Sequence, residues 1–266
     1  MKNFIERKKG VFVSDKIIFQ KDGKTVCNIK GDSELDIAPE WPLTLFRYMP
    51  FSRLYTELEN NTMTFLSPKL WKDPFESAFL DLWKGTDLKC LCFTYNGSIG
   101  EEWAWKAYAC DGQLVRIEVR FDKLVDTLSN LTQQKGSKCC FYICVCDYSM
   151  DKKMLISYKA NLKKTGNVTC IEDFLNIMSN KRKAFAGERE IRIFAVENNN
   201  NNSVVSYGGV NYASFTSRVL LEPLNPFEDN RMKYYSKMQD IHNLGIKDYL
   251  KSKNIKIQQS RLYEMK

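Results

Sequence analysis

Apolar side chains stand at every second position from Val115 to Phe121, and mostly charged side chains occupy the positions between them. Successive side chains of a strand point to opposite faces, so this segment predicts a half-buried strand. Shorter apolar runs predict further strands at residues 43–49, 62–67, around 91–93, 139–146, 188–196, from 203 onwards, 218–221 and 255–257. The chain is therefore expected to be rich in short strands.

Helical spacing of apolar residues predicts helices between these strands. One is expected to begin at Ser52, whose hydroxyl can cap it, and to end at Asn60. Another is expected to run from Phe174 towards Lys183 and to end at Gly187. Further helical segments are predicted at residues 101–110, 232–243 and 246–251. This mixed order, without an internal repeat, predicts an α+β fold with mixed, mainly antiparallel sheets and peripheral helices.

The first 42 residues are predicted to be an extension of the main domain. Two apolar runs flank Asp22-Gly23, a pair that tolerates positive φ, so residues 11–29 are expected to form a β-hairpin. Prolines and acidic residues mark residues 31–42 as a connector. The main α+β domain is therefore expected to span residues 43–266.

Composition narrows the class of protein but does not identify its chemistry. The 266 residues are 44% hydrophobic and 27% charged, as in an ordinary globular protein. The longest apolar run, residues 139–146, is too short to cross a bilayer, and the first residues do not resemble a secretory signal, so we expect a cytoplasmic protein without a membrane partner. The formal charge of +8 is scattered, and the densest basic segment, residues 181–183, is expected to be solvated.

Several kinds of site lack the residues that they need. The one histidine, His242, falls in a predicted helix, which argues against a histidine-based catalytic triad. Nine cysteines include no Cys-x-x-Cys pair, so no zinc site is expected. Neither a Walker-type loop nor a Gly-x-Gly-x-x-Gly motif occurs, so the phosphate cradles of P-loop and Rossmann proteins are missing.

Two acidic residues, Glu188 and Glu190, stand two positions apart at the start of the strand predicted at residues 188–196. On a strand, Glu188, Glu190 and Arg192 would share one face. Neighbouring like charges persist on open solvent, beside cations, or in a site where one carboxyl has a raised pKa. A salt-bridged surface and a functional carboxylate pair both fit this pattern.

Four sequence blocks resemble, in the same order, the bacterial family called domain of unknown function 2971. They are LFRYMPF at residues 45–51, FLSPKLWKDPFE at 65–76, CFT with WKAYACDGQLVRIEV at 92–94 and 105–119, and GEREIRIF at 187–194. The resemblance covers most of residues 43–263 and implies no settled activity. The chain has Thr94 where the family usually has a serine, and Ala186-Gly187 where it usually has an aromatic residue.

The order of an arginine, a serine and a Glu-x-Glu strand is similar to that of the Arg-Ser-Glu class of ADP-ribosyltransferases. This resemblance implies that Arg47 would hold the pyrophosphate of NAD and that Ser67 would support the nicotinamide ribose. Glu190 would stabilise the oxocarbenium-like sugar as nicotinamide leaves. Glu188 would orient or deprotonate the acceptor. The fold would then be ADP-ribosyltransferase-like.

Other residues of the same blocks would complete an NAD site. Tyr48, Phe65 or Trp71 would stack on nicotinamide, and Asp73 and Glu76 are expected beside the cofactor. The resemblance leaves the acceptor open, as a protein or a nucleic acid. A bacterial role in defence, for instance against phage, or as a toxin would suit this activity.

Two other functions stay open. Asp73, Glu76, Glu188 and Glu190 offer the oxygen ligands that Mg²⁺ prefers, which would suit a nuclease, although no lysine follows the Glu-x-Glu pair at the spacing of restriction-type nucleases. In a non-enzymatic module that binds nucleic acid or protein, Asp73 and Glu76 would only cap and secure a loop.

Overall fold

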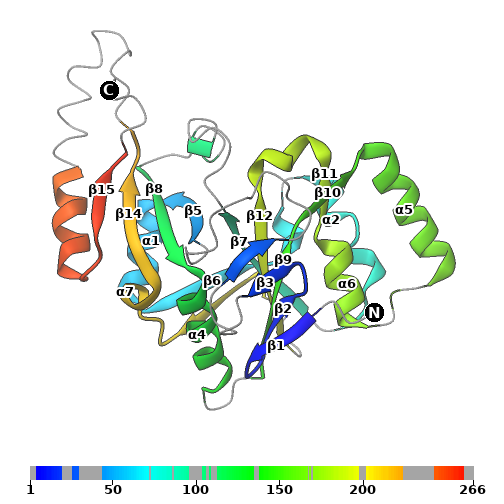
Figure 1. Ribbon diagram of the computed structural model, residues 1–266, viewed down its shortest axis with the longest axis horizontal. Helices are drawn as coiled ribbons and strands as arrows, with labels where there is room; N and C mark the ends of the chain where they lie inside the picture. Colours follow the sequence, from blue (N-terminus) through cyan, green and yellow to red (C-terminus); the bar gives the residue numbers. More distant parts are fainter. Residues whose placement is uncertain are drawn as a thin grey trace, which may run out of the picture.

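One large mixed sheet runs through the part of the chain that the computed structural model describes (Figure 1). Described are residues 4–19, 26–29, 44–71, 73–85, 87–95, 104–105, 108, 113–134, 138–166, 168, 170–197, 202–223 and 243–260. The strands of this sheet are β1 (Phe4–Lys8), β2 (Val11–Ser14), β5 (Thr44–Pro50), β6 (Thr62–Leu66), β7 (Asp87–Tyr95), β8 (Leu114–Arg120), β9 (Cys140–Val145), β12 (Glu190–Glu197), β13 (Val204–Gly208), β14 (Thr216–Leu221) and β15 (Ile257–Gln259).

The strands follow the order β1-β2-β9-β12-β7-β5-β8-β14-β15, and β6 joins β13 to one side of β7. Most neighbours are antiparallel, whereas β2 pairs with β9, and β14 with β15, in parallel. Two small sheets join β3 (Ile17–Phe19) to β4 (Val26–Ile29), and β10 (Asp147–Met150) to β11 (Asn180–Arg182). The predicted α+β class with mixed, mainly antiparallel strands is confirmed.

Helices lie around this sheet rather than within it. They are α1 (Phe51–Glu59), η1 (Pro68–Leu70), α2 (Pro74–Ser77), η2 (Leu80–Leu82), α4 (Phe121–Thr132), α5 (Lys152–Thr165), α6 (Ile171–Met178), η3 (Lys183–Glu188) and α7 (Tyr212–Phe215), and residues 243–252 are also helical. No described helix is long and apolar enough to cross a bilayer. The expected start of α1 is wrong, because the helix follows Pro50 directly and has no side-chain cap.

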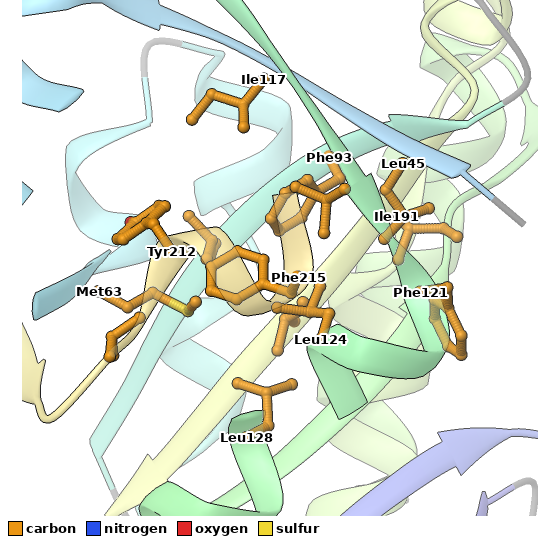
Figure 2. Packing of buried hydrophobic residues seen from close by; sticks show 14 of the residues in the cluster. Leu45, Met63, Phe93, Ile117, Phe121, Leu124, Leu128, Ile191, Tyr212 and Phe215 are labelled. Atoms are coloured by element: carbon orange, nitrogen blue, oxygen red, sulfur yellow. The ribbon is translucent and has the colours of Figure 1, made fainter. Parts of the chain in front are cut away.

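Both faces of the sheet are buried. On one face α4 and α7 bring Leu124, Leu128 and Phe215 against strand residues such as Ile191, as Figure 2 shows. On the other face α6 packs Phe174 against the same central strands. Strand β12 therefore needs apolar residues at successive positions, and Ile191, Ile193, Phe194 and Ala195 supply them.

Strand β8 differs from the half-buried strand that its alternation predicts. Arg116 and Glu118 are each only 4% exposed, so the charged face of the strand is covered as well. The burial is possible because Arg116 Nη2 donates to Glu118 Oε1 at 2.9 Å and Arg218 on β14 also binds Glu118.

The N-terminal segment joins the main sheet. Strands β1 and β2 form one hairpin, and β2 lies beside β9. The predicted hairpin over residues 11–29 is therefore only partly correct: β3 and β4 do pair antiparallel, but β2 does not belong with them. Its turn at Asp22-Gly23 and the connector at residues 31–42 lie outside the described residues. The proposed boundary between residues 42 and 43 stays a prediction.

The predicted helix from Phe174 towards Lys183 is too long. Helix α6 ends at Met178, after which β11 pairs with β10 and a 3₁₀ helix, η3, follows. Residues 180–182 have a weak helix propensity, and their pairing with β10 outweighs it. His242 and residues 198–201 of the asparagine run lie outside the described residues.

Phe65 gives a test of the packing. Its ring is fully buried, with centroids 5.5 Å from Phe141 and 5.4 Å from Tyr207. Phe65→Ala is expected to lower the free energy of unfolding by roughly 3–5 kcal/mol in urea titrations, because it leaves a cavity. The control Val204→Ala, at a side chain on neighbouring β13 that is 48% exposed, is expected to cost about 0.5 kcal/mol or less. Equal costs would contradict the buried position of Phe65.

Candidate functional site

A cleft opens where strands β5, β6 and β7 diverge. Among the described residues, β5 pairs with β7 at two positions, Leu45 with Tyr95 and Phe46 with Thr94, and β6 pairs with β7 at one, Leu66 with Cys90. The space left between these contacts is a cleft of about 170 Å³ lined from both sides. This volume is below the roughly 300–1,000 Å³ of pockets that enclose drug-sized ligands, so the cleft can take one ring or sugar of a larger molecule.

The β5 side of the cleft is basic. Arg47 on β5 and Arg53 on α1 both line it and share the buried carboxylate of Glu57, at 3.5 and 3.2 Å respectively. Tyr212 also donates a hydrogen bond to Glu57. Burial, followed by the charge of Arg47, lowers the pKa of Arg53. Two guanidinium groups against one carboxylate leave this side with an excess positive charge.

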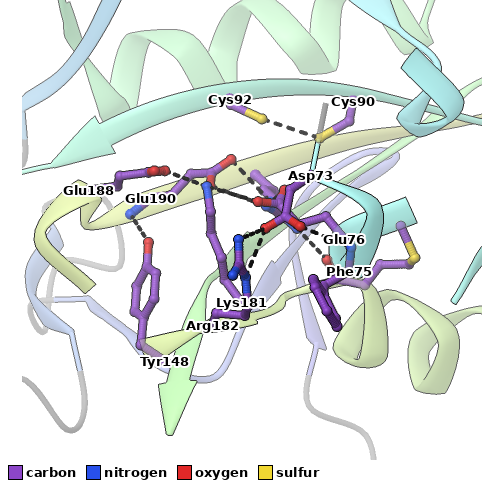
Figure 3. Close-up of polar contacts among 12 residues, drawn as sticks. Asp73, Phe75, Glu76, Cys90, Cys92, Tyr148, Lys181, Arg182, Glu188 and Glu190 are labelled. Atoms are coloured by element: carbon purple, nitrogen blue, oxygen red, sulfur yellow. Dashed lines mark hydrogen bonds and ion pairs between the residues drawn. The ribbon is translucent and has the colours of Figure 1, made fainter. Parts of the chain in front are cut away.

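The β12 side of the cleft is acidic and is formed by Glu190. Its carboxylate is buried and accepts hydrogen bonds from Arg192 Nε at 3.1 Å, Arg192 Nη2 at 3.2 Å and Lys181 Nζ at 2.8 Å (Figure 3). The backbone N–H of Glu190 donates to the Tyr148 hydroxyl at 2.8 Å. Glu190 is thus held by Arg192 of its own strand, by Lys181 on β11 and by Tyr148 on β10.

Lys181 lies at the centre of a buried group that we call the carboxylate cage, made of Glu76, Lys181, Glu188, Glu190 and Arg192. Its ammonium contacts Glu76 at 3.2 Å as well as Glu188 and Glu190. Arg192 contacts Glu76 at 2.5 Å and the Met178 carbonyl at 2.6 Å. Helix α2, strands β11 and β12, and η3 each supply a member. Three carboxylates and two cations leave one net negative charge beside the cleft.

Burial and charge divide the roles of the two glutamates. Burial by itself raises the pKa of Glu190, but the charges of Arg192 and Lys181 outweigh it and hold this pKa well below the ordinary value. Burial raises the pKa of Glu188, and the charge of Lys181 offsets this only in part. Burial likewise lowers the pKa of Lys181, yet Glu190 and Glu76 raise it overall. Glu190 therefore stays ionised, whereas Glu188 takes up a proton more readily than Glu190 does.

Most residues expected in a site do come together. Arg47, Tyr48, Trp71 and Glu190 line the cleft. Glu76 and Glu188 lie behind it in the carboxylate cage, and the Trp71 ring lies 4.2 Å from the Arg192 guanidinium. Asp73 caps α2 through the Phe75 N–H at 2.9 Å and binds Arg182 at 2.9 Å, next to the cage.

Two further expected residues, Ser67 and Phe65, do not line the cleft either. The Ser67 hydroxyl is buried and accepts a hydrogen bond from the Lys69 N–H at 3.4 Å, as the cap of η1. Phe65 points into the core, where it cannot stack on a ligand. Both follow from the alternation of β6, which turns Leu66 to the cleft and Phe65 away from it.

Glu188 also differs from its expected place. It ends η3 and does not lie on β12, because Arg189 adopts a left-handed backbone with φ of 44° between the two elements. Lys181 nevertheless brings its carboxylate beside that of Glu190. The shared face predicted from strand spacing is therefore reached through a turn and a common cation.

The residues that sequence reasoning missed are mainly basic or aromatic. Lys181, expected on a solvated surface, is only 7% exposed. The only signal for it is indirect, since three buried carboxylates need cations from elsewhere. Arg53, Thr94 and Tyr108 also line the cleft. The Tyr108 ring stacks on Tyr48, with centroids 5.4 Å apart and planes at 8°.

The carboxylates of the magnesium hypothesis are occupied by side-chain cations. Glu76, Glu188 and Glu190 converge on one point, and that point holds the Lys181 ammonium. Asp73 is turned to Arg182. Among the described residues no group of three or more His, Cys, Asp or Glu side chains is arranged to hold a metal ion. The geometry therefore does not favour a magnesium-dependent nuclease.

Comparison with known proteins supports one of the two resemblances. The model of a family described as protein of unknown function (DUF2971) matches residues 104–193. The chain resembles this family. The matched segment contains Lys181, Glu188, Glu190 and Arg192, so it includes four of the five members of the carboxylate cage. No curated protein and no solved structure matches significantly, and the similarity to ADP-ribosyltransferases stays a prediction.

Removal of Lys181 tests the carboxylate cage. Lys181→Met is expected to lower the free energy of unfolding at pH 7 by roughly 3–5 kcal/mol, because it leaves buried carboxylates without their shared cation. The loss should be smaller at pH 5, where protonation relieves the repulsion. Lys183→Met, at an exposed position two residues away, is the matched control in the same urea titrations. Equal effects of the two substitutions would contradict the cage.

The depressed pKa of Glu190 predicts a pH dependence of stability. The unfolded chain binds more protons than the folded one once the pH falls below about 5, so wild-type stability drops as the pH falls towards the folded pKa. Glu190→Gln lacks this titration. The stability difference between the two proteins is therefore expected to shrink by at least about 1 kcal/mol between pH 7 and pH 3. A constant difference in urea titrations would show that Glu190 is not held ionised.

Proposed function

We propose that the cleft binds the nicotinamide end of NAD and that the protein is an ADP-ribosyltransferase-like enzyme. The observation that carries this proposal is the opposite charge on the two sides of one aromatic-lined cleft. Arg47 and Arg53 lie on the β5 side, and Glu190 lies on the β12 side. NAD carries an anionic pyrophosphate and develops a cationic sugar as nicotinamide leaves, which suits this pair of charges.

The size and lining of the cleft suit part of the dinucleotide. About 170 Å³ can take nicotinamide, with the pyrophosphate lying towards the arginines. Tyr48 offers an aromatic surface, although its hydroxyl end is held near Arg116 at 3.5 Å. Trp71 lies over Arg192 and can offer its other face. Ser67 is turned away from the cleft. The hydroxyl residue of the cleft that lies nearest to Glu190 in the sheet is Thr94, which is the direct cross-strand partner of Glu190.

The two glutamates would act in succession. The bond between the nicotinamide nitrogen and ribose C1′ breaks, nicotinamide keeps the electron pair, and C1′ becomes cationic. The ionised Glu190, which is one of the three carboxylates of the cage, stabilises this cation. A lone pair of the acceptor then forms a bond to C1′, and the acceptor's proton passes to Glu188, whose pKa is raised by burial.

The cage would act by fixing the position of the carboxylate. Arg192, Lys181 and the Tyr148 hydroxyl hold Glu190 before any ligand arrives. A charge that is already oriented stabilises a developing cation without further reorganisation. As part of the same proposal, the enzyme would act in the bacterial cytoplasm on a protein or nucleic acid, in defence or as a toxin.

Loss of the Glu190 charge tests the proposed reaction. Wild type with metal chelated is expected to bind NAD and release nicotinamide, and Glu190→Gln is expected to release it about 10²–10³-fold more slowly while NAD still binds. Nicotinamide is measured by liquid chromatography and NAD binding by calorimetry. Absence of NAD binding by the wild type at millimolar concentration would exclude the proposal.

The matched control is Glu59→Gln. Glu59 carries the same charge, is 42% exposed at its side chain, and contacts Lys253 and Tyr249 on the surface. It is expected to release nicotinamide at the wild-type rate. Unfolding curves of both variants show whether a loss of release reflects chemistry or loss of fold. Equal release by Glu190→Gln and wild type would remove the role of Glu190.

A further inference from the structure

A row of alternating cations and aromatic rings leads from the surface to the carboxylate cage. We call it the cation–aromatic ladder, made of Lys152, Phe75, Arg182, Phe185 and Lys181. The Lys152 ammonium lies 5.3 Å from the Phe75 ring, and the Arg182 guanidinium lies 4.9 Å from Phe75 and 4.7 Å from Phe185. The Lys181 ammonium lies 5.3 Å from Phe185 and belongs to the cage. Figure 3 shows Phe75 and Arg182 beside the cage.

The outer end of the ladder continues into a basic helix. Helix α5 lies at the edge of the molecule, and apart from Leu155 and Leu162 its residues are exposed or half-buried (Figure 1). Residues 151–166 contain five lysines and one acidic residue, the capping Asp151. Asp81 binds Lys159 and Lys163, which leaves an excess of positive charge on this helix.

Local helix stability does not account for the residues of the first turn of α5. Lys152 and Lys153 occupy its first turn, where the helix dipole favours acidic residues and opposes basic ones. Met154 and Ile156 next to them are each 53% exposed. The first turn of α5, which contacts the ladder, therefore exposes positive charge and apolar side chains to solvent, and this arrangement lowers the stability of the helix.

We propose that the ladder and the first turn of α5 form a binding surface for single-stranded nucleic acid. The exposed Lys152 and Lys153 are placed to bind phosphates, and the rings of Phe75 and Phe185 are placed to stack on bases. Arg182, which is paired with Asp73, and Lys181, which is paired within the cage, hold these two rings in position. Phe75 and Phe185 are half-buried, so their rings are partly open to a ligand. The exposed Lys152 can move from the Phe75 ring to a phosphate and leave that ring to a base.

The same surface suits other polyanions less well. A duplex covers its bases and offers phosphates alone, and an acidic peptide offers carboxylates without flat rings for the two phenylalanines. The ladder ends at Lys181, which contacts Glu188. If the proposed function holds, the bound strand is therefore also the acceptor, because it is led to the residue that would take the acceptor's proton.

Binding is tested without NAD, so that the result does not depend on the proposed reaction. Fluorescence anisotropy of labelled 20-nucleotide single strands of DNA and RNA, and of a duplex of the same length, is measured with the full chain between about 50 and 200 mM salt. Wild type is expected to prefer the single strands. Lys152→Gln with Lys153→Gln is expected to weaken binding about tenfold at low salt and to reduce the slope of log Kd against log salt by about two.

A second variant separates stacking from charge. Phe75→Leu is expected to weaken single-strand binding about tenfold with an unchanged salt slope, because it removes a ring and no charge. The control pair Lys251→Gln with Lys256→Gln changes two exposed lysines of the C-terminal part and is expected to alter Kd by less than about twofold. Unfolding curves confirm that all variants are folded.

Several results would overturn the proposal. They are no single-strand binding at low salt, unchanged binding in both the lysine pair and Phe75→Leu, a preference for the duplex, or lysine-dependent binding of anionic phospholipid vesicles without binding of the single strand. The acceptor role has a separate readout, the gain of an ADP-ribose unit by the bound strand in mass spectrometry when NAD is added. Nicotinamide release without this gain would exclude the acceptor role and leave the proposed reaction standing.

Discussion

The burial of two cations among three carboxylates is the constraint on which the site depends. Lys181 and Arg192 are 7% and 0% exposed, and neither could be buried without carboxylates within reach. Glu76 and Glu190 each contact both of them, and Glu188 contacts Lys181. A displacement of α2, β11, η3 or β12 would expose or unpair a charge. The cage therefore fixes elements that the apolar core alone would allow to shift.

The divergence of strands beside the cage turns this rigid group into a site. A continuous sheet would bury Glu190 completely, but β5 leaves β7 after two residue pairs, so one side of the carboxylate faces a cleft. Arg47 and Arg53 are fixed on the opposite side by Glu57. Opposite charges held on packed elements give a ligand an orientation as well as a place to bind.

The sequence predicted most of the strands, and the reasons are local. Alternating or continuous apolar residues identify β5, β6, β7, β8, β9 and β12. Pro74 keeps the preceding Asp73 out of helical geometry, as expected, with φ of −78° and ψ of 112°. The sequence also brought Arg47, Tyr48, Trp71 and Glu190 to one site.

The predictions that were wrong concern partners that lie far apart in sequence. Lys181 looks like a surface lysine until Glu76, 105 positions earlier, is placed beside it. Arg116 and Glu118 look solvated until Arg218 and the covering side chains are known. The periodicity of apolar residues identifies helices and strands. It does not show which charged side chains of different helices and strands pair with one another.

The parallel pairing of β2 with β9 has a consequence for the order of folding. Val11 to Val13 are synthesised some 130 residues before their partners, Phe141 to Ile143. The β1–β2 hairpin must therefore wait with one edge unpaired while most of the sheet is made. Such long-range contacts slow folding, and open edges invite pairing with other chains. During synthesis, β1 and β2 thus need protection from aggregation until β9 has been made.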